Sequence, residues 1–266
     1  MGKRPAEKLV GDPADVAFFE DLLDAHRTRG FIRVMRWLPT DPRCRLCKSP
    51  FGGRAGRIMK RFGRGPSRKN PTMCSICFEN APMGGVELEI GVLFADVRGF
   101  TSLAEKMAPE EVATLLNRFY AAASDVLTRS GILDKMVGDE VMALYIPRMI
   151  GDHWVDDIVR DAAELLAAVG YGTPEGPWLR LGVGIDIGQA YVGNVGSGVV
   201  KDFTALGDVV NTASRLQSAA SAGQIVMSER LFERLTTPPP NASPVSLDLK
   251  GKQDAEPARV LDLHAP

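Results

Sequence analysis

The sequence lacks the features of a membrane-spanning or secreted protein. No apolar run approaches the roughly 20 residues that cross a bilayer. The start, MGKRPAEKLVGDPAD, has no apolar signal-peptide core. The four cysteines all fall between positions 44 and 77, which excludes a disulfide framework spread over the chain. We therefore expect a cytoplasmic protein with no membrane partner.

A surplus of charge is also missing. The 32 Lys and Arg residues nearly balance the 33 Asp and Glu residues, and the net charge of -1 predicts no general affinity for nucleic acid or membrane. Hydrophobic residues make up 45% of the 266 residues and charged residues 24%, as in a globular protein with a real core. This length suits one large domain, or one ordinary domain with an appendage.

Residues 1–41 are predicted to form an N-terminal helical segment. Asp12 followed by Pro13 is typical of a helix start, and apolar residues then recur at helical spacing over residues 13–29. A second short apolar piece follows at 31–38. The apolar face of this segment must pack against another surface, either in the same chain or in a partner subunit.

Residues 42–80 contain two CxxC pairs, Cys44 with Cys47 and Cys74 with Cys77, separated by 26 residues. Each pair can bind a metal from one tight turn, and four thiolates suit tetrahedral zinc. The interval is rich in Gly, Pro, Arg and Lys and could not bury a core alone, so a metal would hold it together. The spacing does not separate one Zn²⁺ from an iron–sulfur cluster, and four free thiols are a third interpretation.

The cysteine segment is strongly basic. Ten Lys and Arg residues and no acidic residue lie between Arg43 and Phe78. Such cations can offset the net negative charge of a four-thiolate zinc site, which is the interpretation we favour. The alternative is a surface for nucleic acid or another anionic partner. Aromatic residues do not alternate with the basic ones as base stacking requires, so we do not expect a nucleic-acid partner.

From residue 87 onward, strands and helices alternate. This pattern predicts an α+β or α/β fold in which helices cover one face of a sheet. We expect a turn at Gly188-Gln189. The other expected elements are a strand at 90–95, helices at 109–128, 152–169 and 208–221, strands at 178–187 and 190–195, and closing strands at 245–249 and 259–263.

The stretch 133–142 predicts a two-residue hairpin. Gly138 supplies the positive φ that a type II′ turn needs, and Asp139 then stands at the tip. Lys135 lies on the incoming strand among apolar residues. A second carboxylate, Asp96, directly follows a buried strand. Together the two carboxylates would suit Mg²⁺, although each taken singly could be only a cap or a turn residue.

Five motifs stand out between residues 94 and 252. They are FADVRGFTSLAE (94–105), LDKMVGDEVMALY (133–145), LRLGVGIDIGQAYVGNVG (179–196), FTALGDVVNTASRL (203–216) and LDLKGK (247–252). Together they resemble the catalytic domain of class III adenylyl and guanylyl cyclases, in the family's order over about residues 87–265, and the set is far more specific than any one motif. The resemblance implies an α+β fold with a ferredoxin-like βαββαβ core and extra strands, which works as a head-to-tail homodimer with active sites at the interface.

The resemblance also implies metal-binding and phosphate-binding residues. Asp96 and Asp139 match the two aspartates that hold a pair of Mg²⁺ or Mn²⁺ ions, with the Val97 carbonyl as an auxiliary ligand. Backbone N–H groups near Gly99 and Phe100 would face the phosphates of ATP.

Five further positions match residues that contact the nucleotide in this family. Lys135 matches the position that reads the purine, and lysine there resembles adenylyl cyclases, since guanylyl cyclases carry a glutamate. Thr204 stands where an aspartate is usual, as in a bacterial subclass that includes bicarbonate-responsive cyclases. Asn211 and Arg215 match the pair that orients the ribose and stabilises the transition state. Lys250 matches the lysine that contacts the terminal phosphates.

Elementary chemistry supports these roles. Formation of 3′,5′-cyclic AMP and pyrophosphate requires the 3′-hydroxyl to lose its proton and attack the α-phosphorus, which two metal ions can promote. Asn211 and Arg215 share one helix face and can reach one substrate. The Lys135 ammonium can donate to N1 of adenine but not usefully to the N1–H of guanine, and Thr204 can accept from the adenine N6 amine.

The sequence thus predicts an adenylyl cyclase that residues 1–86 regulate. Three alternatives remain: a guanylyl cyclase, a non-catalytic nucleotide-sensing module, and a nucleic-acid-binding regulator built on the cysteine segment. The presence of all the matched positions in one chain argues against the non-catalytic module.

Overall fold

The computed structural model describes residues 9–23, 42–44, 47, 49–67, 73–79, 83–197, 200–249, 251 and 254–263. The chain forms two compact units, and we describe each by itself. The first unit comprises Met1–Leu88 and Gln189–Leu206, and the second comprises Glu89–Gly188 and Gly207–Pro266. The apolar piece expected at 31–38 and the end of the helix expected at 13–29 lie outside the described residues.

The second unit is built on a ferredoxin-like core, as expected. Its sheet has the strand order β3-β4-β2-β5, in which β4 is antiparallel to both β2 and β3. The chain visits β2, α6, β3, β4, α8 and β5 in turn, which is the βαββαβ order. These elements are β2 (Gly84–Val97), α6 (Pro109–Leu127), β3 (Ile132–Val137), β4 (Glu140–Tyr145), α8 (Trp154–Ala168) and β5 (Leu181–Ser197).

Three further strands extend the sheet beyond β5. Strand β7 (Gln224–Ser228) pairs parallel with β5 through the crossover helix α9 (Asp208–Ala219). Strand β9 (Glu256–Asp262) follows antiparallel, and β8 (Ser243–Leu247) forms the edge. Short helices complete the unit: α5 (Phe100–Ala104), α7 (Pro147–Ile150) and α10 (Glu229–Phe232).

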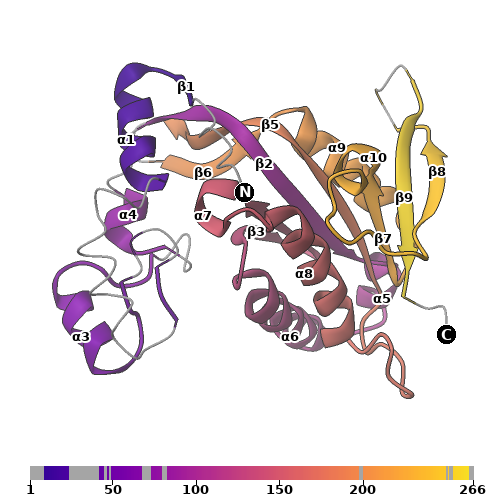
Figure 1. Ribbon diagram of the computed structural model, residues 1–266. Helices are drawn as coiled ribbons and strands as arrows, with labels where there is room; N and C mark the ends of the chain where they lie inside the picture. The colour runs from indigo at the N-terminus through magenta and orange to yellow at the C-terminus, as the bar shows by residue number, and fades with distance from the viewer. Residues whose placement is uncertain are drawn as a thin grey trace. The chain divides into compact units, whose positions relative to one another are not determined.

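Helices cover both faces of this sheet, which corrects the expectation of one covered face. On β7, Ile225 and Met227 join the large core cluster with α6 and α8, which lie side by side in Figure 1. Val226, which points to the opposite face, clusters instead with Leu216 and Ala220 of α9. The helix expected at 208–221 is therefore present, but it packs on the other face from α6 and α8.

The turn expected at Gly188-Gln189 is wrong. Residues 181–197 form one continuous strand, and Gly188 does not adopt the positive φ of a turn glycine. A glycine inside a strand pattern is compatible with continued extension, so the Gly-Gln pair alone was not a sufficient turn signal.

The first unit contains the N-terminal elements and the β5–β6 ribbon. Its elements are β1 (Val10–Gly11), α1 (Pro13–Leu23), α3 (Gly53–Arg61), α4 (Ser75–Glu79) and β6 (Val200–Leu206). Helix α1 starts as expected, because the Asp12 carboxylate accepts a hydrogen bond from the backbone N–H of Ala14 at 2.9 Å. Phe19 of this helix is fully buried.

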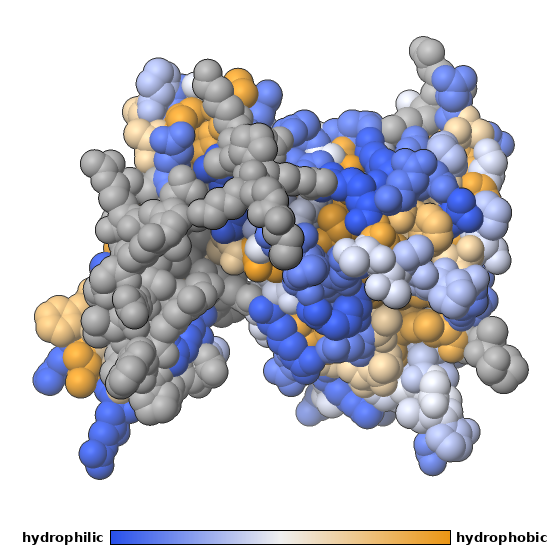
Figure 2. All heavy atoms as spheres, viewed as in Figure 1, coloured by the Kyte–Doolittle hydropathy of each residue, from blue (hydrophilic) through white to orange (hydrophobic). Residues whose placement is uncertain are grey.

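Within the part of the chain that the structure describes, no helix is both long enough and apolar enough to cross a membrane. Hydrophilic side chains make up much of the face seen in Figure 2.

Candidate active site and metal centre

The predicted hairpin is present and places Asp139 at its tip. Strands β3 and β4 are joined by Gly138 and Asp139 alone, and Gly138 has a φ of 59°. This positive φ is what a two-residue primed turn requires. The Tyr120 hydroxyl, from α6, donates to the Gly138 carbonyl at 2.5 Å and fixes the turn from outside the hairpin.

The end of β2 lies beside this hairpin tip. Asp96 pairs with Glu140 in the β2–β4 ladder, and the backbone N–H of Val97 donates to the Asp139 carbonyl at 3.1 Å. The two aspartates that the sequence singled out, 43 positions apart, thus lie on adjoining backbone segments. Asp96 and Asp139 are both half-buried.

The electrostatics of this cluster show a local excess of negative charge. The pKa of the Asp96 carboxyl is raised, first because burial disfavours its charge and also because Asp139 is near, while the Arg98 guanidinium opposes the shift. The pKa of Glu140 is raised first by burial and then by Asp96 and Asp139. A divalent cation with oxygen ligands would relieve this repulsion.

Gly99 and Phe100 follow the cluster directly. Gly99 has a φ of 74° and precedes the first residue of α5. A Cβ at Gly99 would meet no atom within 4 Å, so the backbone there is open on that side. This opening is compatible with the close approach of a phosphate that the sequence led us to expect.

Lys135 lies on the same hairpin as Asp139, four residues before the tip. The β3–β4 register shifts between Leu133 and Lys135, which makes Asp134 an extra residue in a β-bulge. Bulges redirect the side chains that follow them. The Lys135 side chain is half-buried. Thr204 is buried on β6, opposite Gly193 of β5, and belongs to the first unit, whereas Lys135 belongs to the second.

Asn211 and Arg215 lie one turn apart on α9, Asn211 exposed and Arg215 half-buried. An Arg215 guanidinium nitrogen would lie 3.4 Å from a Cβ added to Gly251, so this side chain reaches the segment between β8 and β9. Lys250 precedes Gly251 in the sequence and lies outside the described residues.

The structure adds three residues that sequence reasoning did not assign to the site. Arg98 forms an ion pair with Asp96, Glu140 lies opposite Asp96, and Tyr120 holds the Gly138 turn. Arg98 and Glu140 stand inside the quoted motifs, so their positions were visible although their contacts were not. No sequence signal marked Tyr120, because its contact depends on how α6 packs.

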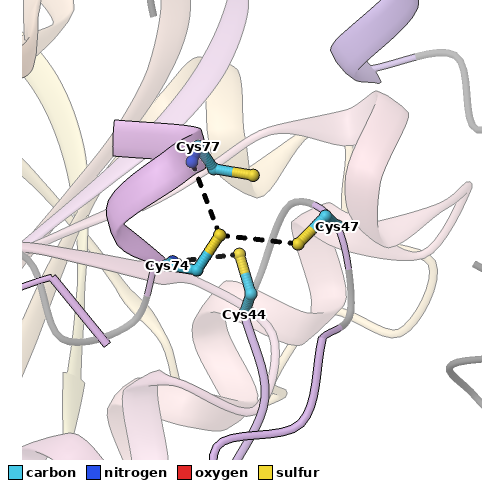
Figure 3. A group of neighbouring side chains, drawn as sticks. All are labelled: Cys44, Cys47, Cys74 and Cys77. Carbon is cyan, nitrogen blue, oxygen red and sulfur yellow. Dashed lines mark hydrogen bonds between the residues drawn. The ribbon is translucent and has the colours of Figure 1, made fainter. Parts of the chain in front are cut away.

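The four cysteines form one compact cluster in the first unit. Their Sγ atoms all lie within 4.8 Å of one another, and all four thiols are free of disulfides (Figure 3). Cys44 and Cys74 are fully buried. This cluster could hold a metal ion.

The pKa values of the four thiols shift in different directions. The pKa of Cys74 is lowered to about 7, first by the hydrogen bond with Cys44. The pKa of Cys47 is also lowered, first by Cys44. The pKa values of Cys44 and Cys77 are raised, first by Cys47 and by Cys44 respectively. Without a cation, four thiolates this close would repel one another.

Comparison with known proteins identifies the family to which most of the chain after residue 85 belongs. The model of the family described as "Adenylate and Guanylate cyclase catalytic domain" matches residues 86–256, more than half of the chain. The chain belongs to this family. Membership in the cyclase family implies Mg²⁺ or Mn²⁺ at the active site, and the oxygen ligands of Asp96 and Asp139 fit such an ion.

Two curated adenylate cyclases show the extent of the sequence similarity. The adenylate cyclase of Anabaena cylindrica is 30% identical over 199 residues, which is 66% of this chain and 38% of that protein. The adenylate cyclase of Mycobacterium tuberculosis (strain ATCC 25618 / H37Rv) is 35% identical over 151 residues, 55% of this chain and 33% of that protein. The chain therefore spans only about a third of the length of these cyclase relatives.

Solved cyclase structures match the same part of the fold. The crystal structure of the guanylyl cyclase Cya2 aligns with a TM-score of 0.59 at 29% identity, over 67% of this chain and 93% of that chain. The crystal structure of the adenylyl cyclase CyaB from P. aeruginosa aligns with a TM-score of 0.55 at 28% identity, over 66% and 95%. One of these structures is named a guanylyl cyclase and the other an adenylyl cyclase. The fold alone therefore does not show whether a cyclase uses ATP or GTP.

We expect Asp96→Asn to stabilise the cyclase fold in buffer free of Mg²⁺ and Mn²⁺. Because burial raises the pKa of this carboxyl, the folded state keeps its proton to a higher pH than the unfolded state does. The free energy of unfolding therefore falls as the pH rises from the pKa of Asp96 in the unfolded chain to its pKa in the folded chain. The variant has no carboxyl at this position and lacks that loss. Urea unfolding at a series of pH values upward from the ordinary Asp pKa should show an advantage of the variant that grows with pH and levels off once the folded Asp96 carboxyl is ionised.

The matched control is Asp125→Asn, which removes an exposed carboxylate from α6. Its stability relative to wild type should not change with pH. An Asp96→Asn protein that is less stable than wild type at every pH would show that the ion pair with Arg98 outweighs the cost of burial.

Proposed function

We propose that the protein is an adenylate cyclase, which converts ATP to 3′,5′-cyclic AMP and pyrophosphate at the interface of a head-to-tail homodimer. The observation that carries the proposal is the juxtaposition of Asp96 and Asp139 beside an open Gly99 backbone, in a chain of the cyclase family. Lys135 on the same hairpin supports ATP as the nucleotide.

Asp96 and Asp139, with the Val97 carbonyl, would hold the two metal ions. When bound, Mg²⁺ or Mn²⁺ lowers the pKa of the 3′-hydroxyl and neutralises charge on the phosphates. The backbone N–H groups near Gly99 and Phe100 would bind the phosphates.

Residues of α9 would then act on the ribose and the reacting phosphate. Asn211 orients the ribose, and Arg215 one turn later donates to the α-phosphoryl oxygens as negative charge develops there. The reach of the Arg215 guanidinium toward Gly251 brings it to the segment that carries Lys250, whose ammonium would bind the leaving pyrophosphate.

The base preference rests on Lys135 and Thr204. An ammonium donates to the N1 acceptor of adenine, whereas the N1 of guanine is itself a donor. Thr204 is buried on β6, and its hydroxyl would accept from the adenine N6 amine. Because a hydroxyl can also donate, discrimination should be weaker than with an aspartate, so a guanylyl cyclase remains the alternative within this family.

Exposed apolar side chains at the hairpin support the dimer. Met136 is 40% exposed and Val137 67% exposed, and both lie between Lys135 and the Gly138 turn. Leu103 of α5, in the motif that follows Asp96, is 38% exposed. Apolar residues grouped around site residues are typical of a surface that a partner covers. In a head-to-tail dimer, Lys135 and Asp139 of one hairpin would serve two different active sites.

Contacts inside the first unit suggest how the N-terminal region would regulate turnover. The ring of Phe19 in α1 stacks on Phe203 of β6, with centroids 6.4 Å apart and an interplanar angle of 22°. Phe203 directly precedes Thr204. Figure 1 shows α1 beside the β5–β6 ribbon. A change in α1 would therefore move the residue next to the base-reading position.

Close backbone approaches make this packing stiff. A Cβ on Gly193, the partner of Thr204 in the ribbon, would lie only 2.4 Å from Gly85 Cα. A Cβ on Gly84 would lie 2.1 Å from the Asp15 carboxylate of α1. The first contact joins backbone atoms of β2 and the ribbon, so these two strands have little freedom to shift separately, whereas the Asp15 carboxylate is the flexible end of a side chain and can turn aside.

For the cysteine segment, we propose a bound metal, with zinc and an iron–sulfur cluster as the two candidates from the sequence. A non-catalytic nucleotide sensor and a nucleic-acid-binding regulator are the remaining alternatives. Salt-dependent retention on DNA or RNA would favour the latter.

The direct test is product formation from Mn²⁺-ATP and from Mn²⁺-GTP, followed by chromatography of the nucleotides. Cyclic AMP should be the main product. Arg215→Ala should lower kcat at least 100-fold, because it removes a donor to the developing charge. Absence of cyclic nucleotide from an intact dimer would exclude the enzyme, and a larger yield of cyclic GMP would establish the guanylyl alternative.

Complementation tests the shared active site. Lys135→Ala and Asp139→Ala should each be nearly inactive alone, since each damages both sites of its homodimer. Mixed in equal amounts, they should recover about a quarter of the wild-type activity, because half of the dimers are mixed and each has one intact site. No recovery after confirmed subunit exchange, or full activity of a monomer, would contradict the head-to-tail arrangement.

Truncation of Phe19 tests the regulatory contact. In Phe19→Ala, loss of the stacking partner of Phe203 should loosen Thr204, which raises the KM for ATP and lowers the preference for ATP over GTP. Phe19→Leu should restore much of both, and Glu20→Ala, at an exposed position of the same helix, is the control. A fall in melting temperature with unchanged KM and base preference would show that Phe19 only stabilises the fold.

A further inference from the structure

The arrangement of the four cysteine sulfurs separates the two metal candidates. All four Sγ atoms lie within 4.8 Å of one another, and those of Cys47 and Cys74 are 3.6 Å apart. Figure 3 shows the four side chains turned toward one common centre. These short sulfur–sulfur distances limit the size of the metal centre that can fit between the four sulfurs.

One tetrahedral ion matches this limit. With zinc–sulfur bonds of about 2.3 Å, the ligands of a tetrahedral ion lie about 3.8 Å apart, so sulfurs already within 4.8 Å of one another need only a small inward shift to bind one ion. In an iron–sulfur cluster the four thiolates are divided between two or four irons, and the iron and sulfide core lies between them. That core would force some of the cysteine sulfurs farther apart than two bonds to a single ion allow.

The groups around the sulfurs are those that stabilise metal-bound thiolates. The backbone N–H of Cys74 donates to Cys44 Sγ at 3.2 Å, and that of Cys77 donates to Cys74 Sγ at 3.4 Å. The hydroxyl of Ser49 lies 3.1 Å from Cys47 Sγ, and Ser49 is fully buried. The Cys47 thiol donates this bond to the Ser49 hydroxyl; as a thiolate it would instead accept from the same hydroxyl, which is the outer hydrogen bond that orients a metal ligand.

Backbone contacts anchor one cysteine of each CxxC pair, Cys44 and Cys74. The first pair is closed by the bridge between Arg43 and Pro50, with the N–H of Cys44 donating to the Ser49 carbonyl at 2.8 Å. The second pair begins at a bridge between Pro66 and Cys74 and continues into α4. All four positions are filled by protein, which is typical of a structural site and not of a catalytic one.

The segment has few other means of holding its shape. Its buried apolar side chains, among the residues described between 42 and 79, are the two cysteines Cys44 and Cys74 together with Pro50, Met73 and Phe78. A core of this size cannot offset the conformational entropy of a segment rich in glycine. Metal binding would supply the missing free energy of folding.

We propose that Cys44, Cys47, Cys74 and Cys77 bind one zinc ion in a closed tetrahedral site that folds residues 42–79. The thiolates select a soft ion at this place, whereas the carboxylates of the cyclase site select Mg²⁺ or Mn²⁺. The zinc takes no part in cyclisation. This site does not depend on the proposed activity, since its occupancy is measured without turnover.

The first experiment is elemental analysis with an absorption spectrum of the full chain, purified without air and without chelator. We expect one zinc per chain and no visible colour. Replacement by Co²⁺ should produce intense thiolate-to-cobalt absorption and the visible bands of tetrahedral Co²⁺. Bound iron with a brown colour, or four thiols that titrate freely in a metal-free protein, would overturn the proposal.

The second experiment uses trypsin, because the segment carries ten Lys and Arg residues between Arg43 and Phe78. Removal of zinc should expose these sites and raise the cleavage rate there at least 10-fold, while cleavage of α6 and α8 stays unchanged. Re-addition of Zn²⁺, but not of Mg²⁺, should restore protection. Equal cleavage of the zinc-loaded and zinc-free chains would mean that the metal does not fold the segment.

Variants separate the ligands from their surroundings. Cys47→Ser should lose most of the bound zinc, and Ser49→Ala should keep the zinc stoichiometry but release it faster to a chelator. Lys60→Ala, on the exposed side of α3, is the control and should behave as wild type. Unchanged zinc content in Cys47→Ser would contradict the four-ligand site, whether or not the variant remains an active cyclase.

Discussion

The hydrogen bond from the Val97 N–H to the Asp139 carbonyl joins the two parts of the candidate active site. It holds the end of β2 against the β3–β4 turn, and the ladder pair Asp96 with Glu140 continues that contact into the sheet. This pairing brings the carboxylates of Asp96 and Glu140 together, and burial already raises the pKa of both. The sheet tolerates the repulsion because its hydrophobic core, packed by α6 and α8, fixes the register independently of the carboxylates.

The second face of the sheet is covered by α9, which carries Asn211 and Arg215. Helix α9 approaches β5 so closely that a Cβ on Gly184 would lie 2.0 Å from the backbone nitrogen of Gln217. The same helix carries Asn211 and Arg215, so the glycine in β5 determines how near these side chains come to the sheet. The residues proposed to bind the metal ions and those proposed to stabilise the transition state therefore come from the sheet and from a helix packed on it, and each set is positioned by backbone contacts that tolerate little displacement.

Much of the cyclase fold could be predicted from the sequence because its signals are local. The Gly138-Asp139 turn, the Asp12 cap and the 109–128 helix each depend on residues close in sequence, and all three were confirmed. The contacts that were missed join distant segments. The ion pair of Arg98 with Asp96 has a local partner but depends on the fold of the loop, and Tyr120 reaches Gly138 only through the packing of α6.

The two wrong expectations have the same origin. Gly188 looked like a turn residue because its neighbours in sequence do not reveal that the strand continues to pair with β6 on one side. The assignment of all helices to one face failed because apolar residues on both sides of β7, Ile225 and Val226 among them, do not show which helix covers which side. Apolar residues along a strand predict which faces of the sheet are buried. Which helix packs on each face depends on the order in which the chain connects its elements.

The same reasoning explains why the cysteine spacing alone left the metal open. Two CxxC pairs specify four thiolates but not the distance between the pairs, which depends on how the 26-residue interval folds. In the structure the two pairs lie within the reach of a single ion, and the chain around them is held by the bridges of Arg43 with Pro50 and of Pro66 with Cys74. A chain with carboxylates that suit hard cations in one unit and thiolates that suit a soft cation in the other can fill both sites at once, because ligand chemistry keeps the two metals apart. The proposed zinc site then sets the shape of the N-terminal segment without competing for the ions that the proposed cyclisation requires.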